Sequence, residues 1–381
     1  MKIHLSRPDI TEQEVEAVCK VLRCPDLSLG PKLSEFEQAF CQYIGRRRAV
    51  AVNSGTSALH LCLMALGIGP GDEVITSPFT FIASATPIMM AGATPVFADI
   101  NPETLNIDVN CIKQRLTPKT KAILPVEVFG NPAGIDEIRF FAQANHIYVV
   151  EDSCEALGSE LHGQKAGTFG DLSVFAFYPN KQITTGEGGM ILTDNEQWAD
   201  ICVSLRNQGR GLSGQWLSHE RLGYNYRLSD IQCALGLIQL SRLQELNAKR
   251  AQVAKWYRKR LQQDERLILP QAPKDSQTSW FVFVVRLQTG FSRKERDHLL
   301  GKLLQSGIQV GNYFPPVHLQ PVMVKQFGYQ AGDYPTAESV GDRTIALPFH
   351  THLTEANIDF ICETLASSLD QISLMNTPSA R

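Results

Sequence analysis

Hydrophobic residues fall in short runs that alternate with longer amphipathic segments through the first half of the chain. Short apolar runs predict buried strands, and apolar residues at spacings of three and four predict helices. The predicted strands cover residues 49–53, 73–76, 95–99, 121–126 and 147–150, and predicted helices over 81–90 and 135–144 lie among them. This alternation predicts a mainly parallel sheet that is covered by helices on both faces.

Three segments carry the signature of a helix start, in which serine or threonine is followed three residues later by glutamate or glutamine. These capping boxes are Thr11–Glu14, Ser34–Glu37 and Ser229–Gln232. The first two predict two helices before the first strand, with a break at 29–31 and an end near Gly45. The third predicts one long amphipathic helix that continues toward Trp256.

The last third of the chain begins with a polar, proline-containing junction at residues 271–276. Beyond the junction the pattern predicts a strand over 280–287, a helix over 292–305, a strand start at 307–310 and a last helix over 355–369. We therefore expect a large domain over residues 1–265 that includes the N-terminal helices. A smaller C-terminal α/β domain over 266–374 and a loose tail at 375–381 should follow.

Composition excludes several function classes. A net charge of −3 leaves no basic excess for nucleic acid, and no apolar run is long enough to span a bilayer. The first residues carry no apolar signal core. The nine cysteines form no C-x-x-C pair, which argues against a zinc site or a disulfide framework. Reduced thiols in a cytoplasmic protein that holds no metal fit this distribution.

The strand predicted at 49–53 runs directly into Ser54, Gly55, Thr56 and Ser57, where a helix begins. A helix start presents free backbone N–H groups and the positive end of the helix dipole, and both attract phosphate. The alternative is a simple serine or threonine cap without a ligand. The sequence pattern leaves both interpretations open.

Asp152 stands two residues beyond the apolar strand that ends at Val150. Ligands of parallel sheets bind beyond the carboxyl ends of the strands. A carboxylate at this place could hold a metal, a ribose or a protonated ring nitrogen. It could equally cap a following helix.

Lys181 follows an apolar strand that begins near Val174 and is broken by Pro179 and Asn180. Glycines at 186, 188 and 189 then allow tight turns close to a ligand. A lysine in an apolar pocket loses hydration, which favours the neutral amine that attacks a carbonyl to form a Schiff base. The alternative is an ordinary solvated lysine.

One cofactor needs a phosphate seat, a carboxylate and a lysine on a parallel α/β sheet, namely pyridoxal 5′-phosphate (PLP). Four segments, residues 53–60, 151–158, 177–189 and 222–227, closely resemble the DegT/DnrJ/StrS sugar aminotransferases. The resemblance extends from about residue 5 to residue 369. It implies an α/β protein with the PLP-dependent transferase fold type I, which is the aspartate aminotransferase fold.

The resemblance also implies a function. Members of this family transfer an amino group from an amino acid, which we expect to be glutamate, to a nucleotide-linked keto sugar. The product is an amino sugar for a surface polysaccharide or a secondary metabolite. A homodimer with shared active sites is implied as well.

The family motifs assign expected roles to individual residues. Lys181 matches the lysine that binds the cofactor aldehyde and carries the proton, and Asp152 matches the partner of the pyridine nitrogen. Gly55, Thr56 and Ser57 match the phosphate turn. Phe81 matches an aromatic residue stacked on the ring, unless it is helix core. Asn225 matches an asparagine that reaches the phosphate of the neighbouring subunit, unless it is a turn residue.

Two positions depart from the family pattern. Ala176 stands where many members have a serine that binds phosphate, so one phosphate contact must come from elsewhere. Glu155 stands where many have glutamine or histidine beside the cofactor, and it could alter substrate preference or the electronics of the cofactor. Arg227 and His318 are candidate substrate contacts, and for both a structural role is equally open.

Three other functions compete with amino transfer. A PLP-dependent sugar dehydratase of the same fold has histidine at the lysine position, so Lys181 argues against it. A regulatory protein that kept the fold and lost turnover is disfavoured by the intact pair of Asp152 and Lys181. A plain nucleotide-binding protein lacks its G-x-G-x-x-G fingerprint in this sequence.

Overall fold

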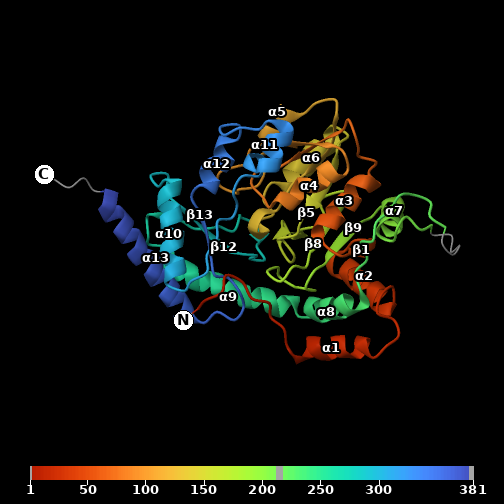
Figure 1. The fold of residues 1–381 in the computed structure, drawn as a ribbon, viewed down its shortest axis with the longest axis horizontal. Coiled ribbons are helices and arrows are strands. Elements are labelled where there is room, and N and C mark those ends of the chain that lie inside the picture. Colours follow the sequence, from red (N-terminus) through yellow and green to blue (C-terminus); the bar gives the residue numbers. More distant parts are fainter. Residues whose placement is uncertain (1, 212–217, 377–381) are drawn as a thin grey trace.

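A central sheet of seven strands organises the computed structural model, which describes residues 2–211 and 218–376 (Figure 1). Its neighbours are, in order, β1 (Arg48–Val52), β9 (Gly189–Thr193), β8 (Leu172–Ala176), β5 (Tyr148–Asp152), β4 (Thr120–Leu124), β2 (Glu73–Thr76) and β3 (Thr94–Phe97). The strands from β8 to β3 pair in parallel, whereas β9 is antiparallel to both of its neighbours. The predicted mainly parallel sheet is therefore confirmed.

Both faces of this sheet are buried, because alternate residues of each strand pack against different helices. On β1, Val50 and Val52 face α3 (Gly55–Ala65) and α7 (Glu196–Arg206). Ala49 and Ala51 face α2 (Pro31–Ile44) on the other side. Farther along the sheet, α5 (Val109–Arg115) and α6 (Ile135–Ala144) cover that second face. This two-sided burial explains why the strands are apolar runs instead of alternating patterns.

A second, antiparallel sheet lies near the C-terminal end of the chain (Figure 1). It comprises β10 (Leu267–Ile268), β12 (Phe283–Leu287) and β13 (Thr344–Leu347), and α10 (Arg293–Gln305) and α13 (Glu355–Asn376) pack on it. Ile3 belongs to the same apolar cluster, as do Val253 and Tyr257 of α9 (Leu243–Leu261). The chain start and a long helix therefore help to build this unit, while the division at residue 265 stays a prediction.

The described part of the chain contains further short elements. They are η1 (Ile82–Ser84), α4 (Thr86–Met90), η2 (Val128–Gly130), β6 (Glu160–Leu161), β7 (Gln164–Lys165), β11 (Ser276–Gln277), η3 (Val317–Leu319), α11 (Pro321–Phe327) and α12 (Pro335–Gly341). Strands β6, β7 and β11 form a small separate sheet. The sequence patterns did not predict this sheet, β9 or α7.

Two of the three predicted capping boxes are confirmed. Thr11 opens α1 (Glu12–Leu22) and Ser229 opens α8 (Asp230–Ser241), each with the reciprocal bonds to the residue three positions on. The box at Ser34 is wrong, because α2 already begins at Pro31 with Gly30 as its cap. Proline at the first helical position fixes the starting geometry, and the Ser34 hydroxyl instead donates to the carbonyl of Pro31.

Several predicted boundaries also need correction. The helix expected over 81–90 is broken into η1 and α4, with Pro87 in the first turn of α4. The strand start at 307–310 is only an isolated bridge between Ile3 and Ile308. Of the tail predicted at 375–381, residues 375 and 376 belong to α13, and the others lie outside the described residues.

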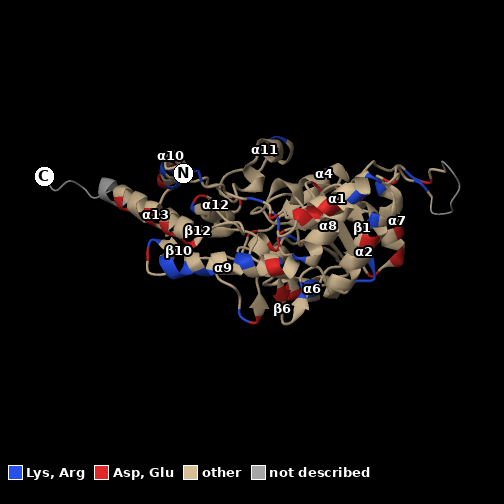
Figure 2. Cartoon of the chain, turned by 90° about the horizontal axis from the view of Figure 1, so that it is seen from below, with Lys and Arg blue, Asp and Glu red and all other residues tan. Residues whose placement is uncertain are grey.

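The single helix predicted from Ser229 toward Trp256 is two helices, α8 and α9 (Leu243–Leu261), that meet at Arg242. Figure 2 shows Lys and Arg gathered along α9, and its last turn carries Arg258, Lys259 and Arg260. Arg242 differs from these because it is buried. Its guanidinium donates to Asp9 at 2.9 Å and to Glu14 at 2.6 Å. This buried ion cluster joins the N-terminal segment to the junction of α8 and α9.

The cluster changes the titration of both carboxyl groups. Burial alone acts to raise the pKa of Asp9 and of Glu14. Hydrogen bonds from Arg242 and other donors outweigh burial and lower each pKa to about 2.

Replacing Arg242 with methionine should destabilise the fold, because Asp9 and Glu14 would stay buried without their cation. We expect the free energy of unfolding, measured by urea denaturation at neutral pH, to fall by about 3–5 kcal/mol. Both carboxyl pKa values are depressed in the folded state, so the stability that they contribute is present above roughly pH 4 and is lost below it. The deficit of the variant should therefore shrink as the pH falls toward the folded-state pKa values of about 2.

Arg260→Met provides the control. Arg260 lies in α9 and pairs with Glu355 and Asp359, whose side chains are exposed. Exposed ion pairs contribute little to stability, so this variant should unfold much like the wild type. Equal losses in the two variants would contradict the role of the buried cluster.

Candidate active site

A cavity of about 680 Å³ opens where β5 and β8 end side by side. The parallel strands bring their carboxyl ends to this edge, where ligands of such sheets bind. The walls come from the start of α3, the segment before α4, the chain after β8 and five residues from the last third of the chain. The lining residues that matter below are Gly55, Thr56, Phe81, Ser84, Asp152, Cys154, Glu155, Ala176, Tyr178, Lys181, Glu187, Phe281, Asn312, Tyr313, Phe314 and Pro315.

Asp152 is the last residue of β5, and its carboxylate lies in the wall of the cavity. Oδ2 accepts a hydrogen bond from the Ser84 hydroxyl at 2.8 Å, and Oδ1 accepts one from the Cys154 N–H at 3.3 Å. Turns instead of a helix follow Asp152, so the alternative of a helix cap is wrong. Two fixed donors orient the carboxylate and leave each oxygen with a further lone pair for a ligand.

Lys181 reaches the same cavity from the loop after β8. Its amine lies 3.4 Å from Glu155 Oε1 and 4.0 Å from the centre of the Phe281 ring. The side chain is only 14% exposed, so it is not the solvated surface lysine of the alternative interpretation.

Glu155 is held from a second side as well, because its Oε2 accepts the N–H of Phe129 at 2.8 Å. Burial raises the pKa of Glu155, and the nearby amine of Lys181 opposes this rise. The sequence left the role of a glutamate at this position open, and the structure shows which group it contacts. The carboxylate of Glu155 forms an ion pair with Lys181.

The start of α3 has the backbone arrangement that the predicted phosphate seat requires. The Ser54 hydroxyl accepts the Ser57 N–H, and the Ser54 carbonyl accepts the Ala58 N–H. Among the described residues, no acceptor takes the N–H groups of Gly55 and Thr56. Ser54 is therefore a helix cap, and two donors beside the cavity remain free for an anion.

Glycine is required where this turn meets β8 and β9. A Cβ on Gly55 would lie 2.8 Å from the Cβ of Ala176, and a Cβ on Gly189 would lie 2.6 Å from the Ser54 carbonyl oxygen. Three backbone segments therefore approach closely at the phosphate seat. Ala176 fits this crowding, but it offers no hydroxyl to a phosphate.

Phe81 lines the cavity and is 62% exposed, so the alternative of helix core is wrong. Its backbone is extended, immediately before η1. An exposed aromatic ring at the mouth of the cavity is available to contact a planar ligand.

The other predicted residues lie away from the cavity. Ser57 is buried and bonded to Ser54. Asn225 is exposed and forms an isolated bridge with Asn207, and Arg227 donates to the side chain of Asn207 at 3.0 Å. Residues 225 and 227 therefore do not line the cavity of their own chain.

His318 is completely buried among aromatic rings, 4.7 Å from the ring centre of Tyr334. Its Nε2 lies 3.0 Å from Glu338 Oε1, and burial lowers its pKa. This geometry favours the structural role that the sequence left open.

Sequence patterns missed several residues of the site. Ser84, which orients Asp152, lay hidden inside a predicted helix, although its hydroxyl in an apolar segment was a usable signal. Phe281, Tyr313 and Phe314 come from the last third of the chain, and only the tertiary fold brings them to the cavity.

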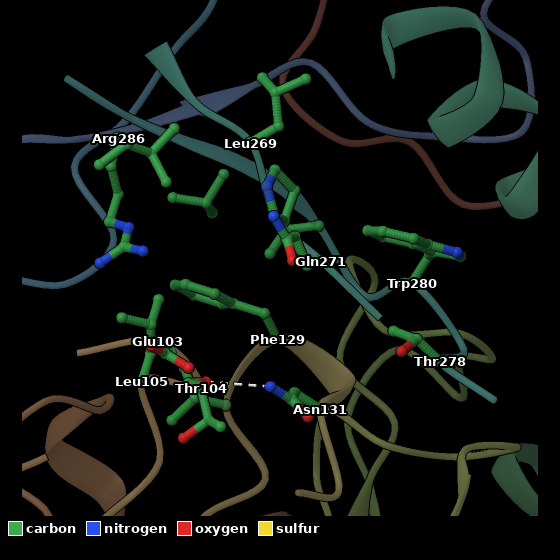
Figure 3. A pocket seen from close by; sticks show the side chains of 15 residues that line it. Glu103, Thr104, Leu105, Phe129, Asn131, Leu269, Gln271, Thr278, Trp280 and Arg286 are labelled. Atoms are coloured by element: carbon green, nitrogen blue, oxygen red, sulfur yellow. Dashed lines mark hydrogen bonds between the residues drawn. The ribbon is translucent and has the colours of Figure 1, made fainter. Parts of the chain in front are cut away.

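A second cavity, of about 350 Å³, lies on the other side of the chain at residues 280–284 (Figure 3). Trp280, Val282 and Val284 line it, whereas Phe281 faces the first cavity. Figure 3 shows Arg286, Phe129 and Trp280 around this space. Neither Lys181 nor Asp152 borders it, so the chemistry of a lysine and a carboxylate belongs to the first cavity alone.

In the residues described, no group of three His, Cys, Asp or Glu side chains could hold a metal ion. The described helices include none with the length and apolar character that crossing a membrane requires. The first cavity combines a lysine, a buried carboxylate, free helix N–H groups and an exposed aromatic ring. Its volume lies in the range of cofactor sites, and these groups fit the aldehyde, the ring nitrogen, the phosphate and the ring face of PLP.

Comparison with known proteins agrees with this fit. The sequence model of the DegT/DnrJ/EryC1/StrS aminotransferase family matches residues 8–366. GDP-perosamine synthase of Caulobacter vibrioides is 40% identical, over 92% of this chain and 94% of that protein. The spore coat polysaccharide biosynthesis protein SpsC of Bacillus subtilis is 39% identical, over 94% and 95%.

Solved structures share the whole fold. Spr1654 of Streptococcus pneumoniae in its PMP form superimposes with a TM-score of 0.93 at 30% identity, covering 98% of this chain and 99% of that one. Helicobacter pylori PseC, an aminotransferase of pseudoaminic acid biosynthesis, superimposes with a TM-score of 0.92 at 27% identity, covering 97% and 100%. The expected fold type I is thereby confirmed.

Proposed function

Because the chain belongs to the DegT/DnrJ/EryC1/StrS aminotransferase family, we propose that it transfers an amino group from an amino acid to a keto sugar linked to a nucleoside diphosphate. The protein is a PLP-dependent aminotransferase. The observation that carries the proposal is that Lys181 and Asp152 line one cavity beside the free N–H groups of α3. Glutamate is the donor that we propose.

Several residues of the cavity have a defined role in this proposal. PLP, when bound, accepts the electrons released at the carbon that carries nitrogen. The Lys181 amine would hold the cofactor at rest. It would then carry the proton from the α-carbon of the amino-acid donor to the aldehyde carbon of the cofactor, and in the second half from there to the sugar carbon that receives nitrogen. Asp152 holds the protonated ring nitrogen, and the N–H groups of Gly55 and Thr56 hold the phosphate. Phe81 covers the ring.

Glu155 has a task that the family pattern did not assign. Its carboxylate lies 3.4 Å from the Lys181 amine, and its other oxygen is fixed by the Phe129 N–H. The negative charge at this place attracts the amine and holds it in the cavity. Glu155 therefore sets the direction of Lys181 between proton transfers.

The relatives support the type of product. A GDP-perosamine synthase is 40% identical to this chain, and a spore coat polysaccharide biosynthesis protein is 39% identical. We propose that the amino sugar made here also enters a surface polysaccharide. Nine cysteines without a disulfide support our proposal that the reaction takes place in the cytoplasm.

We further propose a homodimer in which Asn225 completes the site of the neighbouring subunit. Asn225 is exposed and lies outside its own chain's cavity, and Leu222 close to it in sequence is 81% exposed. An exposed leucine beside an exposed asparagine suits a subunit contact. Arg227, bonded to Asn207, would brace this segment.

Lys181→Ala should abolish amino transfer. We expect turnover to fall by at least about 10³-fold, because both the attachment point of the cofactor and the proton carrier are lost. Borohydride should no longer attach the cofactor covalently to the chain, so the absorbance of the reduced cofactor should be lost on dialysis. Absorbance spectra and a transamination assay with glutamate and keto sugars test both points.

Lys165→Ala serves as the control for Lys181→Ala. Lys165 is bonded to the carbonyl of Tyr43, outside the cavity, and its loss should leave colour and turnover unchanged. Full transamination by Lys181→Ala would show that Lys181 is not the reactive lysine.

Glu155→Gln should shift the pH dependence of the reaction. Glutamine can still accept the Phe129 N–H, but it removes the negative charge beside Lys181. Burial raises the pKa of Glu155, so its carboxylate is protonated at a higher pH than an ordinary glutamate, and removing this group should move the acid limb of the kcat profile to lower pH. Glu155→Asp, which keeps the charge, is the matched variant. Profiles that coincide for wild type and Glu155→Gln would rule out this task.

Asn225→Ala should weaken cofactor retention in the site of the partner subunit. Mixed dimers of Asn225→Ala chains and inactive Lys181→Ala chains test directly whether each active site contains residues of both subunits. Random exchange makes half of the dimers mixed, and each mixed dimer would contain one site with both native residues. Activity should thus recover to about one quarter of the wild-type value. No recovery above the two parents would mean that the sites are not shared.

A further inference from the structure

Arg250 in α9 is a buried cation with unusual partners. The residue is 4% exposed, yet its side chain takes part in none of the ion pairs found among the described residues. Its guanidinium donates instead to three backbone carbonyls. These belong to Lys181 at 2.8 Å, Phe281 at 3.1 Å and Trp280 at 3.4 Å.

Burying a cation without a carboxylate costs stability. The loss of hydration amounts to several kcal/mol for each buried ion, and it is offset only by good partners. Burial also lowers the pKa of Arg250, to about 10. Arg242, eight positions earlier, is buried as well but is paired with Asp9 and Glu14. Arg250 therefore has no comparable compensation within the fold.

The three carbonyls explain what Arg250 holds together. One belongs to Lys181 itself, on the loop after β8. The other two belong to the chain at 280–281, which separates the two cavities and whose Phe281 ring lies 4.0 Å from the Lys181 amine. A single planar group thus fixes both the backbone of the lysine and the aromatic surface on which its amine rests.

We propose that Arg250 is a positioning residue that fixes the place of the Lys181 amine through these three carbonyls. The inference rests on the proposed role of Lys181. Three donors in a rigid fork hold the loop and the chain at 280–281 at one fixed separation. The guanidinium also places a positive charge beside the carbonyl of the lysine, and this charge contributes to the electrostatic field in which a bound cofactor would titrate.

The charge effect can be separated from the other groups of the cavity. The titratable side chains that share the cavity with Lys181 are Asp152, Cys154, Glu155, Tyr178, Glu187 and Tyr313. None of these side chains is itself changed when Arg250 is replaced. A change in the pH dependence of the bound cofactor would therefore report the loss of the guanidinium charge.

Two variants of Arg250 and one control test the proposal on the protein loaded with PLP. Arg250→Met removes the charge and the donors, and Arg250→Lys keeps the charge without the fork. Arg258→Met is the control, because Arg258 lies in the same helix, stacks 5.3 Å from the Trp280 ring and bonds the Pro270 carbonyl without touching Lys181. The measurements are kcat, the dissociation constant of PLP and the pH midpoint of the cofactor absorbance.

We expect kcat of Arg250→Met to fall roughly 100-fold, as for a misplaced catalytic group. Its absorbance midpoint should move to higher pH, because a neighbouring positive charge is gone. Arg250→Lys should lose rate but keep the midpoint, and Arg258→Met should match the wild type in both. Arg250→Met with the rate and midpoint of Arg258→Met would overturn the proposal.

If Arg250→Met fails to fold, Arg250→Lys tests the positioning role of Arg250 instead. A wild-type kcat in Arg250→Lys would then overturn the proposal, and a reduced kcat with an unchanged midpoint would support it. Lys181→Ala distinguishes this failure from failure of the proposed function. If Lys181→Ala loses turnover while the Arg250 variants behave like the control, only the positioning role is wrong.

Discussion

The close backbone approach at Gly189 is the constraint on which the site depends. Gly189 pairs with Val52 at the end of β1 and with Ala176 at the end of β8. Because β9 lies between them and is antiparallel to both, β1 and β8 run in the same direction and both end beside Gly189. The free N–H groups of α3 and the loop of Lys181 thereby reach one edge of the sheet. A side chain at position 189 would meet the Ser54 carbonyl and push the two apart.

The remaining walls come from distant parts of the chain. Phe281 and Tyr313 approach from the C-terminal third, and Ser84 fixes Asp152 from the segment before α4. Lys181 is thus held between the Glu155 carboxylate and an aromatic ring, with its carbonyl bonded to Arg250. Each contact restricts the amine from a different side, and this is the preorganisation that proton transfer at a carbon requires.

Much of this arrangement could be predicted from the sequence, because its parts are local. Asp152 and Lys181 each follow an apolar strand, and the parallel order of such strands places their ends at one edge. The antiparallel β9 could not be foreseen, since pairing direction depends on tertiary contacts. The break at Arg242 escaped prediction because the helical pattern continues across it, and only the buried Asp9 and Glu14 explain it. For His318 the sequence left a substrate contact and a structural role open, because its aromatic surroundings are visible only in three dimensions.

The alanine at position 176 follows from the same crowding and has a consequence for the phosphate. Gly55 and Ala176 lie so close that a side chain on the glycine would collide with the alanine. In the site that we propose, backbone N–H groups and the positive end of α3 therefore hold the phosphate where a serine hydroxyl is missing. A seat built from fixed backbone dipoles loses little entropy on binding, but it supplies no full positive charge. A donor from a neighbouring subunit, such as the exposed Asn225, would contribute more here than in a seat that retains the serine.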